Sequence, residues 1–468
     1  MMTKTKIICT IGPATESYDM LQKMNNAGMN IIRLNMSHGD HASHKKVIDN
    51  IRKINKKSNW PIGILLDTQG PEIRTGDLST SLDLKTGSII SVTLRDGMNV
   101  EETSIHINYE DMLNSVNVGD KITVDNGLIN LEILEKQDRL MKCKVIDGGI
   151  LKSKRHVNLP GIRVNLPAIT SKDKDDIIFG LKNDVDFIAL SFVREVKDIH
   201  ELKKIMGNNI GKVKIIAKIE DQEGVKNIDE IIEEADGIMV ARGDLGVEIN
   251  IEELPNVQRE IVRKCAEKGR RVIIATHLLE SMIVNPIPTR AEATDVANAV
   301  YEEVDAVMLS GETAAGKYPV KCIEYLKKII HKSEKLNGLK FTNDLIIDND
   351  KQHLTVSAVK LAEALKAKGI MVFTKLGSIA DYISNYHPYS VNIYAFTNVE
   401  QTMHTLLLNR AVLPYKINFS SDREKTLQTA FNILKEKEGF NNGDKVVVIS
   451  NVLTGTEKSN AIQIREIR

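Results

Sequence analysis

Features that would direct the protein to a membrane or to nucleic acid are missing from the sequence. No stretch approaches the roughly 20 consecutive apolar residues of a membrane span, and the N-terminus lacks the apolar segment of a secretory signal. Neither sign of charge is in excess, because Lys plus Arg and Asp plus Glu both number 63. No overall field therefore favours nucleic acid or an anionic membrane, and we expect neither as a partner.

Cysteine is scarce and scattered. No two of the four cysteines are close enough in sequence to suggest a zinc site or a redox dithiol: they are Cys9, Cys143, Cys265 and Cys322. We expect reduced thiols in the core. Together with the missing signal segment, this predicts a cytoplasmic protein.

Hydrophobic residues are plentiful, at 42% of the 468-residue chain, and this length predicts two or three domains. Short apolar runs of strand length alternate with segments of helical periodicity, such as 18–27, 41–57, 195–206, 254–268 and 289–302, which indicates βαβ units. The eight runs begin at Lys6, Ile31, Ile62, Phe187, Lys214, Gly237, Arg271 and Ala306. Eight such units predict an α/β fold built on a (β/α)8 TIM barrel.

The third and fourth runs are separated by far more than one helix. Between residues 70 and 166, segments such as ITVDNGLINLEI and SIISVTL alternate apolar and polar residues between Gly, Asp and Asn turns. We interpret residues 70–166 as an inserted all-β lid domain, a small β-barrel. The remainder, residues 1–69 and 167–338, is close to the about 250 residues of a typical TIM barrel, at whose mouth the lid could exclude water.

The C-terminal part has the pattern of a separate unit. The polar stretch 338–351 resembles a linker, and we expect residues 339–468 to form a C-terminal α/β regulatory domain. Its segment HLTVSAVKLAEALKAKG predicts a helix capped by Gly369, and IMVFT, VNIYAFT and KVVVIS predict strands.

Two neighbouring runs end in the residues that carry most chemical information. In IIAKIEDQEG (215–224), Lys218 and Glu220 share one face of a strand while Ile219 packs behind them. In GIMVARGDLG (237–246), an apolar run is followed by Asp244 in a glycine-flanked turn. Two carboxylates at the ends of successive strands could hold one divalent cation, with the lysine facing the anion that the cation binds. We interpret the pair as a phosphoryl-transfer site.

A second polar group follows the second and third runs. Arg33, Asn35 and Ser37 fall at i, i+2 and i+4, so one strand face offers a guanidinium, an amide oxygen and a hydroxyl. An ordinary turn after the strand is the alternative interpretation. Asp67 and Thr68 end the third run, and the resulting all-oxygen set of low charge suits a monovalent cation better than zinc.

Further candidates lie at the remaining strand ends and at the entry to the lid. Arg74 either clamps a polyphosphate as the lid closes or pairs with an aspartate at the hinge. Thr276 places a hydroxyl at the mouth of the barrel. Ser310 and Glu312 could position water or relay a proton, although SGE fits an ordinary strand-to-helix turn equally well.

These segments together resemble the pyruvate kinase family. The motifs that carry the resemblance include KTKIICTIGPAT, IIRLNMSHG, LLDTQGPEIRTG, IIAKIEDQEG, IMVARGDLGVE and MLSGETAAGKYP, in the order expected of the family, over about residues 4–330. The resemblance implies a barrel, an inserted lid and a C-terminal α/β domain. It also implies phosphoryl transfer from phosphoenolpyruvate to ADP, giving pyruvate and ATP in the last step of glycolysis, and a homotetramer.

The resemblance also assigns roles to residues. Glu220 and Asp244 bind Mg²⁺ or Mn²⁺, while Lys218 and Arg33 bind the phosphoryl group in flight, because this transfer needs charge neutralisation and positioning. The other sets are the substrate carboxylate site of Gly243, Asp244 and Thr276, a water relay through Thr276, Ser310 and Glu312, a K⁺ site of Asn35, Ser37, Asp67 and Thr68, and a nucleotide site of Asn35, His38, Arg74 and Arg155 with a second Mg²⁺.

Some positions bear on the cations and the nucleotide. Members that need no potassium carry a lysine where this chain has Glu72, so we expect a K⁺ requirement. The chain departs from the family pattern at several positions, namely Gln69, His277, Asn126, Arg155 and His156. The departures in the lid could alter nucleotide affinity.

The C-terminal domain departs further. Members activated by sugar phosphates bind a phosphate in a Thr-x-Ser-Gly-x-Ser loop. This chain keeps Thr374, Lys375, Gly377 and Ser378, but Leu376 and Ile379 replace the second and last small polar residues of that loop. We therefore predict weak or absent activation by fructose bisphosphate.

Two other function classes are weighed against the kinase. One is an Mg²⁺-enolate lyase or aldolase, since such barrels also bind pyruvate-like acids through a metal held by Glu and Asp; the potassium set and the lid argue against it. The other is an inactive, metabolite-binding relative. Every residue assigned to chemistry is present, which argues against that class.

Overall fold

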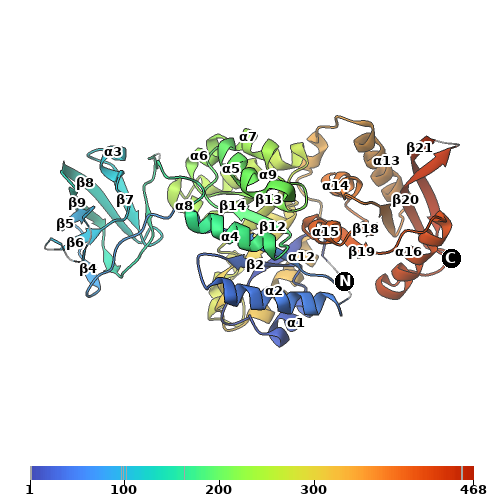
Figure 1. The fold of residues 1–468 in the computed structure, drawn as a ribbon, viewed down its shortest axis with the longest axis horizontal. Coiled ribbons are helices and arrows are strands. Elements are labelled where there is room, and N and C mark those ends of the chain that lie inside the picture. The colour runs from blue at the N-terminus through green and yellow to red at the C-terminus, as the bar shows by residue number, and fades with distance from the viewer. Residues whose placement is uncertain are drawn as a thin grey trace.

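The computed structural model describes residues 3–58, 60–95, 97–98, 100–101, 103–162, 164–454 and 457–468, with the residues between 451 and 459 described by their backbone alone. Three bodies follow one another along the long axis of the molecule (Figure 1). A β-rich lid lies at one end, the barrel lies in the middle, and a C-terminal domain lies at the other end.

The central body is a closed barrel of parallel strands in the order β1-β16-β15-β14-β13-β12-β3-β2, as predicted. Its strands are β1 (Lys6–Thr10), β2 (Ile31–Asn35), β3 (Gly63–Asp67), β12 (Phe187–Leu190), β13 (Lys214–Ile219), β14 (Gly237–Ala241), β15 (Arg271–Ala275) and β16 (Ala306–Leu309). Along β13, Ile215, Ala217 and Ile219 pack under the helices, whereas Ile216 points into the barrel. Lys218 follows Ile216 on the inner face, so the alternation that builds the barrel also aims the lysine into it.

Helices surround this sheet. They are α1 (Tyr18–Ala27), α2 (His41–Asn55), α4 (Ser171–Lys182), α5 (Val196–Met206), α6 (Gln222–Lys226), α7 (Ile228–Glu234), α8 (Arg242–Glu248), α9 (Leu254–Lys268), α10 (Arg290–Tyr301), α11 (Gly311–Ala314) and α12 (Pro319–Ser333), with 3-10 turns η1 (Gly207–Asn209) and η2 (Glu280–Ile283). α4 begins with a capping box in which Asp173 and Thr170 exchange hydrogen bonds. Asp173 Oδ1 also accepts from the N–H groups of Gln69 and Gly70, which fixes the turn after β3 where the chain enters the lid.

The lid contains β4 (Leu82–Leu84), β5 (Ile89–Thr93), β6 (Ser104–His106), α3 (Met112–Ser115), β7 (Lys121–Val124), β8 (Ile129–Gln137), β9 (Leu140–Asp147), β10 (Gly149–Leu151) and β11 (Val157–Asn158). Where the sequence predicts a small β-barrel, the described residues form a six-stranded sheet, β11-β7-β8-β9-β5-β6, and a two-stranded sheet, β10-β4. A separate cluster of buried side chains fills the lid. The lid thus has its own core, although the boundaries at residues 69, 166 and 338 stay predictions.

The C-terminal domain is a five-stranded sheet, β19-β18-β17-β20-β21, in which only β21 is antiparallel to its neighbour. Its elements are η3 (Phe341–Asp344), α13 (Asp350–Ala364), β17 (Gly369–Phe373), α14 (Ser378–Asn385), β18 (Asn392–Thr397), α15 (Glu400–Thr405), η4 (Leu406–Leu408), β19 (Val412–Lys416), α16 (Arg423–Glu438), β20 (Lys445–Thr454) and β21 (Glu457–Glu466). The predicted cap at Gly369 is wrong, because α13 ends at Ala364 and Gly369 begins β17. A Cβ at Gly369 would lie 2.5 Å from the Tyr394 ring, so close packing explains this glycine.

The C-terminal domain closes one end of the barrel. Leu407 and Leu408 of η4 belong to the cluster inside the barrel, together with Ile31 and Phe187 at the amino ends of their strands. The carboxyl ends of the strands therefore remain for a site facing the lid. The four cysteines are buried and unpaired, as expected, and no helix among the described residues is long and apolar enough to cross a membrane.

Candidate active site at the carboxyl ends of the barrel strands

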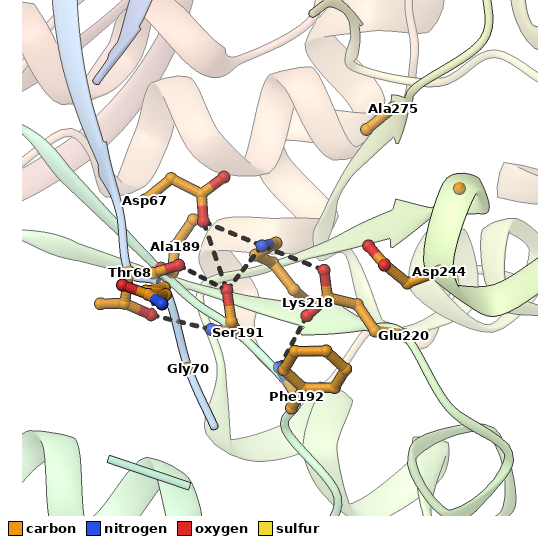
Figure 2. A network of polar contacts seen from close by, with 12 residues as sticks. Asp67, Thr68, Gly70, Ala189, Ser191, Phe192, Lys218, Glu220, Asp244 and Ala275 are labelled. Atoms are coloured by element: carbon orange, nitrogen blue, oxygen red, sulfur yellow. Dashed lines mark hydrogen bonds and ion pairs between the residues drawn. The ribbon is translucent and has the colours of Figure 1, made fainter. Parts of the chain in front are cut away.

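Lys218 lies at the centre of a buried polar network. Its Nζ contacts Asp67 Oδ1 at 2.9 Å and Glu220 Oε1 at 3.0 Å, and it donates to Ser191 Oγ at 2.6 Å (Figure 2). β13 ends at Ile219, so Glu220 lies one residue beyond the strand, but its side chain points to the same side as Lys218, as predicted. Burial opposes the charged amine, yet the charges of Asp67 and Glu220 raise the pKa of Lys218 above its ordinary value. The lysine is therefore a fixed positive charge.

Asp67 is fully buried between two cations. Its Oδ2 accepts from Arg33 Nε at 2.5 Å, and Arg33 also donates to Thr10 Oγ1 at 3.1 Å. Burial would raise the pKa of Asp67, but the charges of Arg33 and Lys218 hold it below the ordinary value. This carboxylate stays charged and aims both cations at the mouth of the barrel.

Glu220 and Asp244 form a second acidic pair, in which the ion pair between Lys218 and Glu220 only partly offsets burial. Burial raises the pKa of Glu220 to about 7, with the charge of Asp244 adding to the effect and that of Lys218 opposing it. The pKa of Asp244 is also raised, although 35% of its side chain is exposed. The two carboxylates face each other (Figure 2), so their negative charges repel. A divalent cation between them would remove this repulsion, and carboxylate oxygens are suitable ligands for such a cation.

The candidate potassium ligands lie beside this network. β2 ends at Asn35, so Ser37 lies in the following turn, and its N–H donates to Asn35 Oδ1 at 3.2 Å. Thr68 Oγ1 accepts from the Ser191 N–H at 3.0 Å. Asn35, Ser37 and Thr68 face one cavity and supply only oxygen donors, which suits an alkali cation. Asp67 differs from them because its oxygens already contact Arg33 and Lys218.

The turn after β15 touches the start of α8. The Gly243 N–H donates to Thr276 Oγ1 at 2.7 Å, and that hydroxyl donates to the Ala275 carbonyl at 2.6 Å. Thr276 has φ of +67°, a conformation that costs a β-branched residue energy and that often marks a functional constraint. The structure thus brings Gly243 and Thr276 together beside Asp244.

Ser310 and Glu312 differ in how their side chains are used. Glu312 accepts from the N–H groups of Ser310 at 2.7 Å and Leu279 at 3.0 Å, so both of its oxygens tie the ends of β16 and β15 together. Ser310 Oγ is buried and has no hydrogen-bond partner among the described residues. Glu312 therefore has the geometry of the turn that the alternative interpretation predicts, whereas Ser310 keeps a free hydroxyl.

Lid residues complete the cavity, which has a volume of about 290 Å³. Arg74 lines it and pairs with Glu72 Oε2 at 2.6 Å, rather than with the aspartate that the hinge alternative expected. Arg155 lies 3.5 Å from Asp125 Oδ1. The cavity lining comprises Arg33, Asn35, Ser37, His38, Thr68, Lys218, Glu220 and Asp244 from the barrel, Gln69, Glu72 and Phe192, and Arg74, Asp125, Asn126, Lys154, Arg155 and His156 from the lid side.

Comparisons with known proteins show the family of this chain. A family model described as "Pyruvate kinase, barrel domain" matches residues 2–323, and one described as "Pyruvate kinase, alpha/beta domain" matches residues 352–465. The chain belongs to the pyruvate kinase family.

Relatives in this family match nearly the whole chain. A pyruvate kinase of Staphylococcus epidermidis is 44% identical over 464 residues, covering 97% of this chain and 78% of the relative. Plastidial pyruvate kinase 3, chloroplastic, of Arabidopsis thaliana is 42% identical over 473 residues, covering 99% and 82%. A pyruvate kinase of Staphylococcus aureus is 42% identical over 474 residues, covering 99% and 80%.

The sequence did not predict some residues of the site in this member of the pyruvate kinase family. Ser191 accepts from Lys218 and donates to the Thr68 carbonyl at 2.6 Å, and the Phe192 N–H donates to Glu220 Oε2 at 2.7 Å. Ser191, the next-to-last residue of FIALSF, was the available signal. A second cavity, of about 490 Å³, shares Arg33, Asn35 and His38 with the first and is otherwise lined mainly by Thr10–Pro13, Glu16, Ser43, His44, Ser310, Gly311, Ala314 and Ala315.

The predicted effector loop, residues 374–379, lies in the C-terminal domain, away from the candidate site. Thr374 Oγ1 accepts from the Gly377 N–H at 2.9 Å, and Gly377 is the N-cap residue of α14, with φ of +89°. Leu376 is 87% exposed, and Ile379 packs against the domain core. The loop therefore presents an apolar side chain to solvent.

Proposed function

We propose that this protein is an active pyruvate kinase that transfers the phosphoryl group of phosphoenolpyruvate to ADP, giving pyruvate and ATP. The observation that carries the proposal is one cavity in which Lys218 and Arg33 lie beside Glu220 and Asp244, at the end of a barrel that belongs to this family. Phosphoryl transfer depends mainly on positioning and charge neutralisation, and this cavity offers both.

Glu220 and Asp244 would hold Mg²⁺ or Mn²⁺, because their mutual repulsion fits a divalent cation. The cation would supply charge for the substrate oxygens as a Lewis acid. Lys218 is held by three neighbours and Arg33 by Asp67, so neither cation needs to reorient when the phosphoryl group passes. Such preorganised charge is what lowers the barrier in a transfer of this kind.

The substrate carboxylate would bind at Thr276 and the N–H groups of Gly243 and Asp244. The enolate that remains after transfer must gain a proton, and we assign this to a water relay of Thr276, Ser310 and Glu312. Within this relay the unpartnered Ser310 hydroxyl is best able to bind the water, because both Glu312 oxygens accept backbone N–H groups.

The nucleotide would lie between barrel and lid. Arg74 and Arg155 face the phosphates from the lid side, with Asn35 and His38 opposite and a second Mg²⁺ near Arg74 and His38. The second cavity shares Asn35 and His38 with the first, which makes it a suitable place for the base. K⁺ would bind Asn35, Ser37, Asp67 and Thr68, and we propose a homotetramer on family grounds.

A coupled assay tests the function. With phosphoenolpyruvate, ADP and Mg²⁺, pyruvate should form rapidly in K⁺ and much more slowly in Na⁺. Pyruvate released without ADP would instead support the enolate lyase or aldolase class, and tight substrate binding without turnover would support an inactive relative. Equal rates in K⁺ and Na⁺ would refute the proposed potassium site but not the proposed kinase activity.

A further inference from the structure

The chain leaves the lid along a segment that lies against α8. His156 Nδ1 is 3.8 Å from Asp244 Oδ1, and Asn158 Nδ2 donates to Glu248 Oε1 at 2.7 Å. Asp244 and Glu248 are four residues apart on α8, so they lie on the same face of that helix. Two contacts from one short lid segment therefore meet the helix that carries a proposed cation ligand.

The position of His156 is fixed by its backbone. Residues Arg74 and His156 form an antiparallel bridge, and the Asp125 N–H donates to the His156 carbonyl at 3.0 Å. The ring lies against Phe192, with centroids 6.5 Å apart, and the side chain is 15% exposed. Since the Phe192 N–H holds Glu220, His156 borders both carboxylates of the proposed cation site, Asp244 directly and Glu220 through Phe192.

We propose that His156 is a lid-borne positioning residue that orients Asp244 for the divalent cation. This inference rests on the proposed function, because it needs Glu220 and Asp244 to bind that cation. A carboxylate ligand is normally held by a hydrogen bond from outside the metal site. At 3.8 Å the contact is longer than a hydrogen bond, and a movement of the lid of about 1 Å toward α8 would make it one. Closure of the lid would then orient Asp244 for the cation at the same time.

Binding of Mn²⁺ to the full-length protein, without nucleotide or phosphoenolpyruvate and followed by electron paramagnetic resonance, tests this. His156→Ala should weaken Mn²⁺ binding by about 10- to 100-fold, the usual effect of losing such an outer partner. His156→Asn places an amide nitrogen near the position of Nδ1 and should restore most of the affinity. Circular dichroism would verify that each variant folds.

Two controls make the outcomes distinct. His200→Ala removes an imidazole that lies 3.3 Å from Glu234 Oε2, outside the cavity, so Mn²⁺ binding should persist. Glu220→Gln should abolish Mn²⁺ binding, and if it does not, the proposed cation site itself fails. If Glu220→Gln abolishes binding but His156→Ala binds Mn²⁺ like the wild type, the role of His156 is overturned; a raised KM for ADP in that variant would then make it a nucleotide contact.

Discussion

Replacing Lys218 by methionine removes the central cation while keeping an unbranched apolar stem. The Nζ atom contacts Asp67, Glu220 and Ser191 within 3.0 Å, and the residue is 7% exposed. The variant leaves Asp67 in contact with one cation, Arg33, and leaves Glu220 without its nearest counter-charge. Removing one partner of a buried ion pair costs about 3–5 kcal/mol, so we expect a lower melting temperature in a protein that still folds.

The effect on rate should exceed the effect on stability. A fixed cation on a transferring phosphoryl group is worth about 10³–10⁵ in kcat in other enzymes, or about 4–7 kcal/mol of barrier. We therefore expect kcat of Lys218→Met to fall at least about 10³-fold in the coupled assay, while Mg²⁺-dependent binding of phosphoenolpyruvate persists through Glu220 and Asp244.

A matched control lies on the same strand. Lys214 begins β13 at the opposite end of the barrel, and its Nζ lies 2.9 Å from Asp236 Oδ1 with both side chains about one-third exposed, at 31% and 33%. Such a pair is worth about 0–1 kcal/mol, so Lys214→Met should keep kcat near the wild-type value. A Lys218→Met enzyme that keeps kcat within about tenfold, or about 1.4 kcal/mol of barrier, would refute the role given to Lys218.

Two further predictions concern the lid and the effector loop. Burial raises the pKa of Glu248 to about 7, and the hydrogen bond from Asn158 opposes this shift. In the folded protein the Glu248 carboxyl therefore stays protonated as the pH rises from about 4.5 to 7. Above pH 7 its ionised form lowers the free energy of unfolding by at most about 3 kcal/mol. Glu248→Gln keeps an acceptor for Asn158 and should raise the melting temperature at pH 8 but not at pH 4; an equal change at both would exclude this titration. Fructose bisphosphate should leave the half-saturation by phosphoenolpyruvate unchanged, because Leu376 and Ile379 occupy the loop; a large decrease in kinetic assays would contradict this.

The barrel was predictable because each of its strands is buried on both faces and so reads as a continuous apolar run. α9 has the predicted bounds, Leu254–Lys268, since Pro255 lies in its first turn and Gly269 ends it in a left-handed conformation. β19 was missed because Pro414 interrupts its pattern, which fits its place at the edge of the sheet. The helix cap predicted at Gly369 was wrong because a glycine that follows a helical pattern can reflect either a cap or close packing.

The site was predictable only where its side chains follow strand periodicity. Lys218 and Glu220 are such a pair: their spacing predicts that they face the same side, and Lys218 Nζ lies 3.0 Å from Glu220 Oε1. The hydrogen bond that holds Glu220 comes from the backbone of Phe192, and a backbone N–H leaves no mark in a sequence. Whether Glu312 serves a turn or a proton relay likewise depends on which N–H groups its oxygens accept, and only the fold decides that.

The charges around Lys218 explain why such a site would need cations before it binds an anion. Asp67, Glu220 and Asp244 bring three carboxylates to a region that holds two cations, Arg33 and Lys218. These inner side chains therefore carry more negative than positive charge when all are ionised, whereas Arg74, Lys154 and Arg155 line the lid side of the same cavity. A divalent cation at Glu220 and Asp244 would reverse the sign of the inner part, and K⁺ would add to the effect, so the proposed ions would draw the phosphoryl group of phosphoenolpyruvate toward Lys218 and Arg33.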